Sequence, residues 1–426
     1  MAASNYPPPL PPSRPAQAGT SPDARRDRNR LLLDAAAGIA LLAALGLVFL
    51  FGRGSASRAG LQSSSIEEVT HAAHVGSEPA GRTSLRLAVT KPPNFENWDD
   101  MGALLRTLGP GYQYTQISLD DLLESDQLDK YDVVFVACSP VPKTWVARRV
   151  RAGVRANTAV FDARPDIKDR LSESLRRFVA GGGTLYASDW QFDLLHIAFP
   201  EMIDEAKVGR GEVQKVAADV VDPGLRKRLG PTISLRFEKS DWRPAAFTGR
   251  NVTTYLQGQY RLTSGERQTG PLLVSFPVGD GTVIFTSFHN EAQNNDVEKE
   301  LLRYLVFTTV TAREDSRVKR TMVRGGLSPQ ERNLLSASSG GQPVGDRYEL
   351  AKAGRLQFAL GFENQGARLR LEVTGPDGRK EEKSDTKTFT IDIPDAKPGV
   401  WSYSVTPLTV PYKDFPFTLT IGEDRR

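Results

Sequence analysis

The sequence predicts a membrane-anchored α/β protein, with a doubly wound parallel-sheet domain followed by a C-terminal all-β sandwich. Three observations lead to this fold class. Residues 31–51 form one apolar run, helix-like and strand-like segments alternate across residues 85–312, and apolar residues alternate with polar ones beyond residue 346. A chain of 426 residues with 39% hydrophobic and 25% charged content has room for two or three folded units. This composition excludes a wholly disordered, collagen-like or polytopic membrane protein.

The charge balance and the cysteine count narrow the range of functions. The 55 basic and 51 acidic residues leave a net charge of +4, and the basic residues are scattered, so we expect no nucleic-acid partner. One cysteine excludes an intramolecular disulfide framework and a cysteine-based zinc cluster, and four histidines leave little for a metal centre. We therefore expect no cofactor and no metal.

The first 84 residues are predicted to anchor the chain in a membrane. Residues 1–30 are rich in proline and end in an arginine cluster, which indicates a disordered basic tail. At 1.5 Å per residue, residues 31–51 reach roughly 30 Å, which is one bilayer crossing. The arginines precede this span, so the positive-inside rule places the N-terminus in the cytoplasm and the folded domains outside. Residues 52–84 are predicted to be a linker. A cleaved signal peptide is the alternative to an uncleaved anchor.

Residues 85–312 alternate between strand-like and helix-like segments. Helices are expected at 98–108 and 172–180, and strands at 85–89, 112–117, 131–137, 184–188 and 281–287. Asp99 or Asp100 is expected to cap the first helix. The glycines at 181–183 lie between a helix and the following strand, which suits a helix C-cap better than a phosphate-binding loop.

Polar side chains follow three of these strands at their carboxyl ends. Residues 138–139 follow one strand, residues 188–190 the next and residues 289–291 the last. Open α/β sheets bind their ligands at this edge. An imidazole two residues from a carboxylate can be oriented by it and act as a general base, so His289 and Glu291 suit half of a nucleophile, histidine and acid triad.

This region resembles the class I glutamine amidotransferase-like superfamily, in particular its trehalose-utilisation-type branch of flavodoxin-like domains. The resemblance covers residues 85–312 and rests on Phe-Val-Ala-Gly-Gly-Gly-Thr-Leu at 178–185 and on Gly-Asp-Gly-Thr-Val-Ile-Phe-Thr-Ser-Phe-His-Asn-Glu at 279–291. It implies a cysteine nucleophile on a sharp strand-to-helix elbow and a His-x-Glu pair that completes the triad. His289 and Glu291 match the pair. The elbow position holds Asp189, with Ser188 beside it and no Gly-x-Cys-x-Gly pattern.

The absent elbow cysteine leaves two interpretations of Ser188, Asp189, His289 and Glu291. Glutamine amide transfer needs a thiolate, so amidotransferase activity is not expected. The four residues form either a variant catalytic site or a hydrogen-bonded remnant of the ancestral pocket that binds a ligand or holds loops. The only cysteine, Cys138, follows a different strand and is expected to be buried and structural.

Two other residue pairs have metal-ligand chemistry. Asp193 and His196 are three apart, a helical-face spacing, but no second cluster completes a coordination shell, so helix-start and capping roles are expected. His71 and His74 lie in the predicted linker, which would hold ligands poorly. Neither pair is expected to bind a metal.

The last third of the chain is predicted to be a linker and a sandwich. Residues 313–345 are low in apolar content and rich in basic residues, which indicates a solvated connector; contact with phosphate or anionic lipid is the alternative. Alternating apolar residues at 369–373, 389–393, 401–405 and 417–421 predict a β-sandwich over residues 346–424. The stretch Ile-Pro-Asp-Ala-Lys-Pro-Gly-Val-Trp-Ser-Tyr-Ser-Val at 393–405 is similar to bacterial pre-peptidase C-terminal domains, which implies a binding or positioning role.

These observations lead to one functional hypothesis and two alternatives. The chain is expected to be a single-pass protein of the bacterial cytoplasmic membrane that presents a non-catalytic amidotransferase-like domain and a β-sandwich outside the cytoplasm, for binding a ligand or an envelope protein. The first alternative is a hydrolase with a variant triad around His289 and Glu291. The second is a structural spacer in an assembly.

Overall fold

The computed structural model describes residues 85–91, 99–147, 162–293, 295–338, 340–363 and 366–425. The predicted tail at 1–30, membrane helix at 31–51 and linker at 52–84 lie outside these residues. No helix among the described residues combines the length and the apolar character that a bilayer crossing requires.

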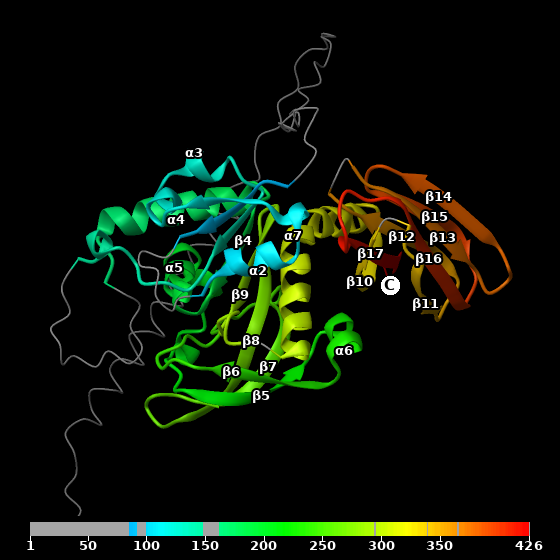
Figure 1. Cartoon of the computed structure of the whole chain (residues 1–426). Coiled ribbons are helices and arrows are strands. Elements are labelled where there is room, and N and C mark those ends of the chain that lie inside the picture. The colour runs from blue at the N-terminus through cyan, green and yellow to red at the C-terminus, as the bar shows by residue number, and fades with distance from the viewer. Residues whose placement is uncertain are drawn as a thin grey trace, which may run out of the picture. The chain divides into compact units, whose positions relative to one another are not determined.

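A nine-stranded mixed sheet forms the centre of the α/β domain (Figure 1). Five of its strands pair in parallel in the order β2-β1-β3-β4-β9, which is the strand order of flavodoxin-like sheets. Their bounds are β1 (Leu87–Thr90), β2 (Tyr114–Ile117), β3 (Val133–Val136), β4 (Thr184–Ser188) and β9 (Gly281–Thr286). A strand was predicted from the sequence at each of these five places.

The other four strands make the sheet mixed, so the prediction of a parallel sheet is incomplete. Beyond β9 the order continues β8-β7-β5-β6, and every pair in this part is antiparallel. Burial alternates along β5, as expected for an antiparallel strand with one solvated face. The strands are β5 (Gln214–Val220), β6 (Thr232–Phe237), β7 (Thr253–Arg261) and β8 (Arg267–Val278).

Helices cover both faces of the sheet, because the central strands are buried on both sides. In β3, Val133 and Phe135 face the core that α2 and α7 complete, while Val134 and Val136 face the core under α4 and α5 (Figure 1). The helices are α2 (Met101–Thr107), α3 (Ser125–Leu128), α4 (Pro165–Ala180), α5 (Phe192–Ala198), α6 (Pro223–Leu229) and α7 (Asp296–Arg324).

The helix ends follow the predicted signals. The side chain of Asp100, rather than that of Asp99, caps α2 by accepting a hydrogen bond from the amide of Ala103 at 2.8 Å. The glycines after α4 form its C-cap: the Gly181 amide donates to the carbonyl of Arg177, and Gly182 has φ 104°, which favours glycine. The interpretation of these glycines as a helix end is therefore confirmed.

The C-terminal module is a sandwich of two four-stranded antiparallel sheets. One sheet has the order β10-β17-β12-β15 and the other β11-β16-β13-β14, and a single apolar core that includes Phe358, Leu371 and Trp401 lies between them. The strands are β10 (Leu327–Ala337), β11 (Val344–Leu350), β12 (Gly354–Gly361), β13 (Arg368–Thr374), β14 (Lys380–Asp385), β15 (Phe389–Ala396), β16 (Gly399–Thr409) and β17 (Phe415–Asp424).

The prediction of a linker at 313–345 is wrong. Helix α7 continues to Arg324, and β10 begins at Leu327 as the first strand of the sandwich. Val318 and Met322 on the helix pack against Leu327 and Ala359, so the end of α7 has an apolar stripe of its own. Several basic residues of this segment form ion pairs: Arg313 with Asp132, Lys319 and Arg332 with Asp315, and Arg320 with Asp280.

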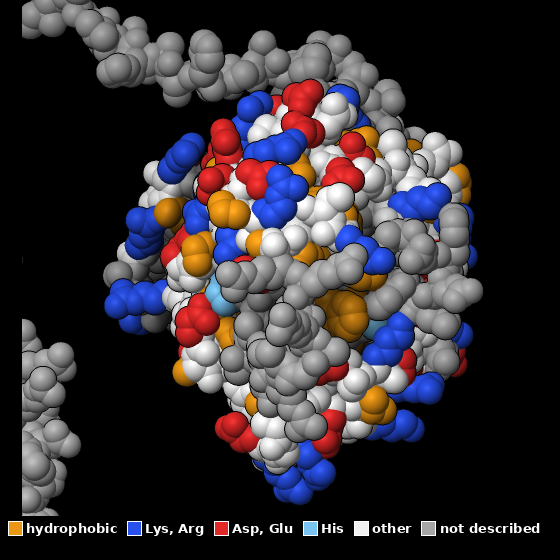
Figure 2. Space-filling model, turned by 90° about the vertical axis from the view of Figure 1, so that its left-hand side faces the viewer, with side chains coloured by type: hydrophobic (Ala, Val, Ile, Leu, Met, Phe, Trp, Pro, Cys, Tyr) orange, Lys and Arg blue, Asp and Glu red, His pale blue; other side chains and the backbone are white. Residues whose placement is uncertain are grey.

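The two signs of charge are mixed on one face of the molecule. Figure 2 shows one face of the molecule, on which the described basic and acidic side chains are interspersed. The visible distribution agrees with the near-neutral net charge of +4.

Candidate functional site

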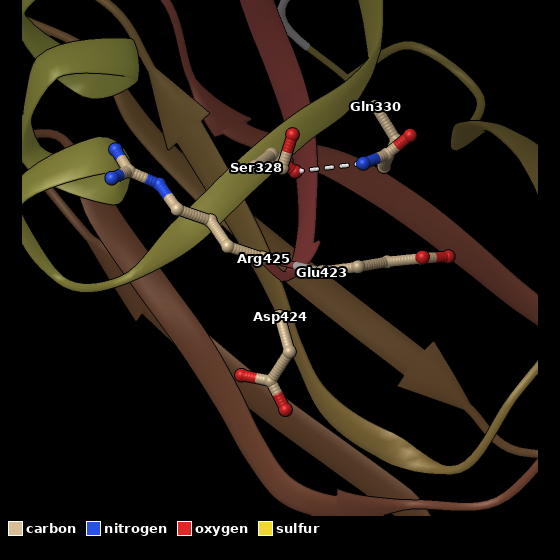
Figure 3. A pocket seen from close by; sticks show the side chains of 5 residues that line it. All are labelled: Ser328, Gln330, Glu423, Asp424 and Arg425. Atoms are coloured by element: carbon tan, nitrogen blue, oxygen red, sulfur yellow. Dashed lines mark hydrogen bonds between the residues drawn. The ribbon is translucent and has the colours of Figure 1, made fainter.

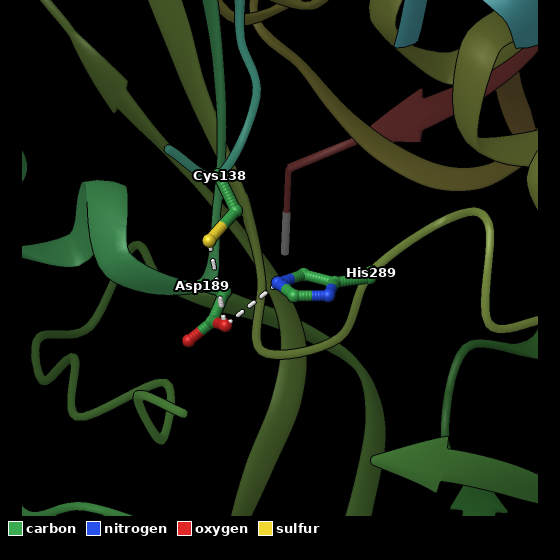
Figure 4. A group of neighbouring side chains, drawn as sticks. All are labelled: Cys138, Asp189 and His289. Carbon is green, nitrogen blue, oxygen red and sulfur yellow. Dashed lines mark hydrogen bonds and ion pairs between the residues drawn. The ribbon is translucent and has the colours of Figure 1, made fainter. Parts of the chain in front are cut away.

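Three buried side chains from three strand ends meet at the carboxyl edge of the parallel strands. Cys138 follows β3, Asp189 follows β4 and His289 follows β9, and Figure 4 shows their side chains converging. Their exposed fractions are 0%, 2% and 5%. This is the edge at which the strand-end rule for α/β sheets predicts a ligand site.

Asp189 occupies a sharp elbow between β4 and the short helical segment Asp189–Gln191 that leads into α5. Its φ of 47° lies in the left-handed region, which a residue other than glycine seldom adopts. Nucleophile elbows have this strained strand-to-helix geometry. The backbone of an elbow is thus present without the Gly-x-Cys-x-Gly pattern, and it carries a carboxylate.

Both oxygens of the Asp189 carboxylate are engaged. Oδ1 accepts a hydrogen bond from the amide of Arg243 at 2.7 Å. Oδ2 lies 2.9 Å from Nε2 of His289 and accepts a 3.5 Å hydrogen bond from Sγ of Cys138. A nucleophilic carboxylate needs an oxygen that faces substrate, and neither oxygen here is available.

His289 lies between two carboxylates. Its Nδ1 is 2.5 Å from Oε1 of Glu238, a residue that directly follows β6 (Thr232–Phe237). Its Nε2 is close to Asp189 but makes no aligned hydrogen bond with any described residue. Burial by itself lowers the pKa of His289, but the contacts with Asp189, Cys138 and Glu238 outweigh burial and raise it. Burial raises the pKa of Glu238, and the hydrogen bond to His289 reverses this shift and lowers it.

Ser188 belongs to a second buried network rather than to the histidine. Its hydroxyl donates to Oδ2 of Asp99 at 2.9 Å and accepts from the amide of Cys138 at 2.9 Å. Asp99 also accepts from the amide of Asn290 at 2.9 Å and from its side-chain nitrogen at 3.3 Å. Burial raises the pKa of Asp99, partly offset by His289 and these hydrogen bonds. The network ties the strand ends to Asp99, in the segment that leads into α2.

Glu291 does not pair with His289. Its side chain is exposed, and no hydrogen bond joins the two residues among the described contacts. Burial, Asp99 and Asp100 raise the pKa of Glu291. Of the four predicted candidates, the structure brings Asp189 and His289 together and leaves Ser188 and Glu291 in other surroundings.

Cys138 is buried, as expected for the only cysteine, but it lies directly beside the histidine. Burial, followed by the charge of Asp189, raises the pKa of its thiol to about 12. Without a further positive charge the group is therefore a neutral thiol near pH 7, unlike the low-pKa cysteines of thiol enzymes.

Asp193 and His196 face different partners. Asp193 forms a buried ion pair with Arg243, with an oxygen-to-nitrogen distance of 2.8 Å. Nε2 of His196 lies 2.6 Å from Oε1 of Glu205. The two side chains therefore have separate partners among the described residues.

Two pockets of the described part of the chain are lined by residues outside this cluster. One, of about 410 Å³, is lined by Ser328, Gln330, Glu423, Asp424 and Arg425, at the start of β10 and the end of β17 (Figure 3). The other, of about 260 Å³, is lined by residues that include Arg210 and Gln268. None of the clustered side chains lines either pocket.

Sequence reasoning missed Glu238 and the role of Asp99. Glu238 lies 51 residues before His289, in the antiparallel part of the sheet, and no motif marks it. Asp99 was considered only as a helix cap. The one available signal was its place beside the first strand-to-helix connection, at the edge of the sheet where ligands bind.

Comparisons with known proteins found only distant structural similarity. A glutamine amidotransferase from Thermotoga maritima is 9% identical over 57% of this chain and 95% of its own, with a TM-score of 0.30. A cytoplasmic protein from Salmonella typhimurium is 12% identical, covering 52% of this chain and 98% of its own, with a TM-score of 0.30. A β-galactosidase from Bacillus circulans sp. alkalophilus is 14% identical over 77% of this chain, which spans 42% of the β-galactosidase, with a TM-score of 0.29. No family model and no curated protein matches the chain.

Proposed function

We propose that this chain is a single-pass protein of the cytoplasmic membrane that displays its amidotransferase-like α/β domain and its β-sandwich outside the cytoplasm, where they bind a ligand or another envelope protein. In this proposal the α/β domain does not catalyse amide transfer. The apolar run at 31–51 and the arginines before it motivate the membrane topology.

The observation that carries the non-catalytic part is the state of the elbow residue. Amide transfer begins with attack by a thiolate on the glutamine carboxamide, and the elbow supplies the carboxylate of Asp189 instead. This carboxylate is buried, and both of its oxygens are engaged by Arg243, His289 and Cys138.

The two remaining nucleophiles of the site are also unsuited to attack. The hydroxyl of Ser188 donates to Asp99, so it has no histidine to take its proton. The thiol of Cys138 is fully buried and hydrogen-bonded to the elbow carboxylate. A binding module that retains the fold of an enzyme accounts for these contacts without a catalytic step.

The catalytic part of the proposal is tested with the full chain in mild detergent. Glutamine, an activated ester and a short peptide are each incubated with the wild type, His289→Ala and His196→Ala, and turnover is measured. The proposal expects no turnover above buffer for all three proteins. Turnover by the wild type and His196→Ala that disappears in His289→Ala would refute it in favour of a hydrolase.

The topology and the binding role have separate tests. Protease added to intact spheroplasts should digest the folded domains, whereas protection of these domains until lysis would contradict their external location. A photo-crosslinker placed at an exposed apolar position, Val213 of the α/β domain or Val400 or Leu408 of the sandwich, should give a discrete adduct in intact membranes. Adduct formation at none of the three positions would count against a binding function.

A further inference from the structure

We propose that Cys138, Asp189 and His289 bind one zinc ion. The three ligand atoms are Sγ of Cys138, Oδ2 of Asp189 and Nε2 of His289, and all lie within 4.8 Å of one another. Thiolate, imidazole and carboxylate are the donors that zinc takes in proteins, and a three-residue set leaves the fourth tetrahedral position to a non-protein ligand such as water.

The spacing of the atoms suits this ion. With Zn–S at about 2.3 Å and Zn–O at about 2.0 Å, tetrahedral geometry places sulfur and oxygen about 3.5 Å apart. The observed distance from Sγ of Cys138 to Oδ2 of Asp189 is 3.5 Å. The corresponding nitrogen-to-oxygen separation is about 3.3 Å, and Nε2 of His289 lies 2.9 Å from Oδ2. Separating these two atoms by a few tenths of an ångström would complete the arrangement (Figure 4).

Hydrogen bonds from neighbouring residues hold the ligand side chains in orientations that suit metal binding. A metal-binding histidine almost always donates its other ring nitrogen to a carboxylate or carbonyl, which fixes its orientation. Nδ1 of His289 lies 2.5 Å from Oε1 of Glu238, so Nε2 is the ring nitrogen that faces Asp189 and the cluster. Oδ1 of Asp189 accepts from the amide of Arg243, which likewise turns Oδ2 toward the cluster.

A further observation concerns the hydrogen bonding of Nε2 of His289. The side chain is 6% exposed, yet Nε2 makes no aligned hydrogen bond with any described residue. Buried polar atoms normally have such a partner. A metal ion in the centre of the cluster would supply it and would be held by the loops after β3, β4 and β9 together.

Cobalt gives the sharpest test, because a thiolate ligand to Co²⁺ produces a sulfur-to-metal charge-transfer band. The full chain without a histidine tag is titrated with Co²⁺ in mild detergent, and Zn²⁺ is then added as a competitor. We expect a band that saturates at one equivalent and that Zn²⁺ abolishes. Cys138 is the only cysteine of the chain, so this band can come from no other residue.

The variants then assign the other ligands. Cys138→Ala should lose the band entirely, and Asp189→Asn and His289→Gln should each weaken binding at least tenfold. Glu238→Gln, which removes no ligand, should weaken it by about 10- to 100-fold. His196→Ala is the matched control, since it removes the other described histidine and should leave the titration unchanged.

The proposal is overturned if the folded wild type gives no thiolate band, or if Cys138→Ala binds Zn²⁺ as tightly as the wild type does. If a variant fails to fold by circular dichroism, the wild-type cobalt spectrum still decides. The result is separate from the proposed binding function, which depends on the turnover and crosslinking tests and not on a metal.

Discussion

The buried carboxylate of Asp99 should be essential for the stability of the α/β domain. It accepts three hydrogen bonds, from the Ser188 hydroxyl and from the backbone and side-chain nitrogens of Asn290. Truncation in Asp99→Ala would leave these buried donors without an acceptor, at about 1–3 kcal/mol each. Two effects reduce this loss: the variant no longer buries a charged carboxylate, and the Ser188 hydroxyl can rotate to another acceptor. We therefore expect a net loss of about 2–4 kcal/mol.

The isosteric variant separates shape from hydrogen bonding. Asp99→Asn keeps one oxygen for the amide of Asn290 but places an NH2 group opposite the Asn290 side-chain nitrogen, so we expect a loss of about 1 kcal/mol. Asp100→Ala is the neighbouring control. Asp100 caps α2 near the surface, and losing this cap should cost about 1 kcal/mol.

Urea unfolding of the full chain in mild detergent, followed by tryptophan fluorescence, measures these differences as shifts of the midpoint. The expected order of stability is wild type, then Asp99→Asn and Asp100→Ala together, then Asp99→Ala. A midpoint of Asp99→Ala equal to that of Asp100→Ala would show that the Asp99 network does not hold the strand ends together.

Three further predictions concern the framework. The ion pair with Arg86 outweighs burial and lowers the pKa of Asp132 below the usual value of about 3.9. A carboxyl group whose pKa is lower in the folded than in the unfolded state stabilises the fold at pH values above its unfolded-state pKa. Asp132→Asn should therefore have a smaller free energy of unfolding than the wild type at pH 7, and this difference should shrink as the pH falls below about 4. A difference that stays constant with pH would contradict this prediction. Met322→Ala should cost about 2–5 kcal/mol in urea unfolding, since Met322 is buried where α7 meets the sandwich, whereas no loss would mean that this contact is not packed. Gly281→Ala should lower the thermal midpoint, because a β-carbon there would clash with the backbone carbonyl of Val179, and overpacking costs about 1–3 kcal/mol; an unchanged midpoint would show that the backbone gives way easily.

The predictable parts of this fold are those with a strong local pattern. The run at 131–137 has apolar residues on both faces, a pattern typical of a central strand in a sheet that is covered on both sides. In the structure this run contains β3. The alternating segments of the sandwich were equally clear. Residues 214–278 were not assigned, although β5 and β6 alternate, because short amphipathic segments do not indicate which sheet they extend.

The predicted linker at 313–345 failed for a different reason. Composition counts charges, whereas stability depends on where the partners of those charges lie. Arg332 lies on β10 and Asp315 on α7, and the fold brings them to a 2.9 Å ion pair. A basic segment with distant acidic partners therefore looks like a solvated connector in the sequence.

The candidate site shows the same limit. Strand-end positions placed Cys138, Asp189 and His289 at one edge, and the structure brings them together. The acid partner of the histidine was predicted from proximity in the sequence as Glu291, but Glu238 occupies that position. Glu238 follows β6, which is not paired with β9 in the sheet. The contact depends on how the loop after β9 packs against β6, where the Arg236 amide donates to Gln293, and the sequence pattern contains no information on this packing.

The central claim is that the elbow offers a carboxylate and that the only thiol is held out of reach. Reaction with an electrophilic glutamine analogue, such as a chloromethyl ketone, followed by intact-mass analysis, tests it most directly. The account predicts that the folded chain stays unmodified, whereas the urea-unfolded chain is alkylated at Cys138, which confirms that the reagent works. An adduct on Cys138 or Asp189 of the folded protein that is absent in His289→Ala would contradict the account.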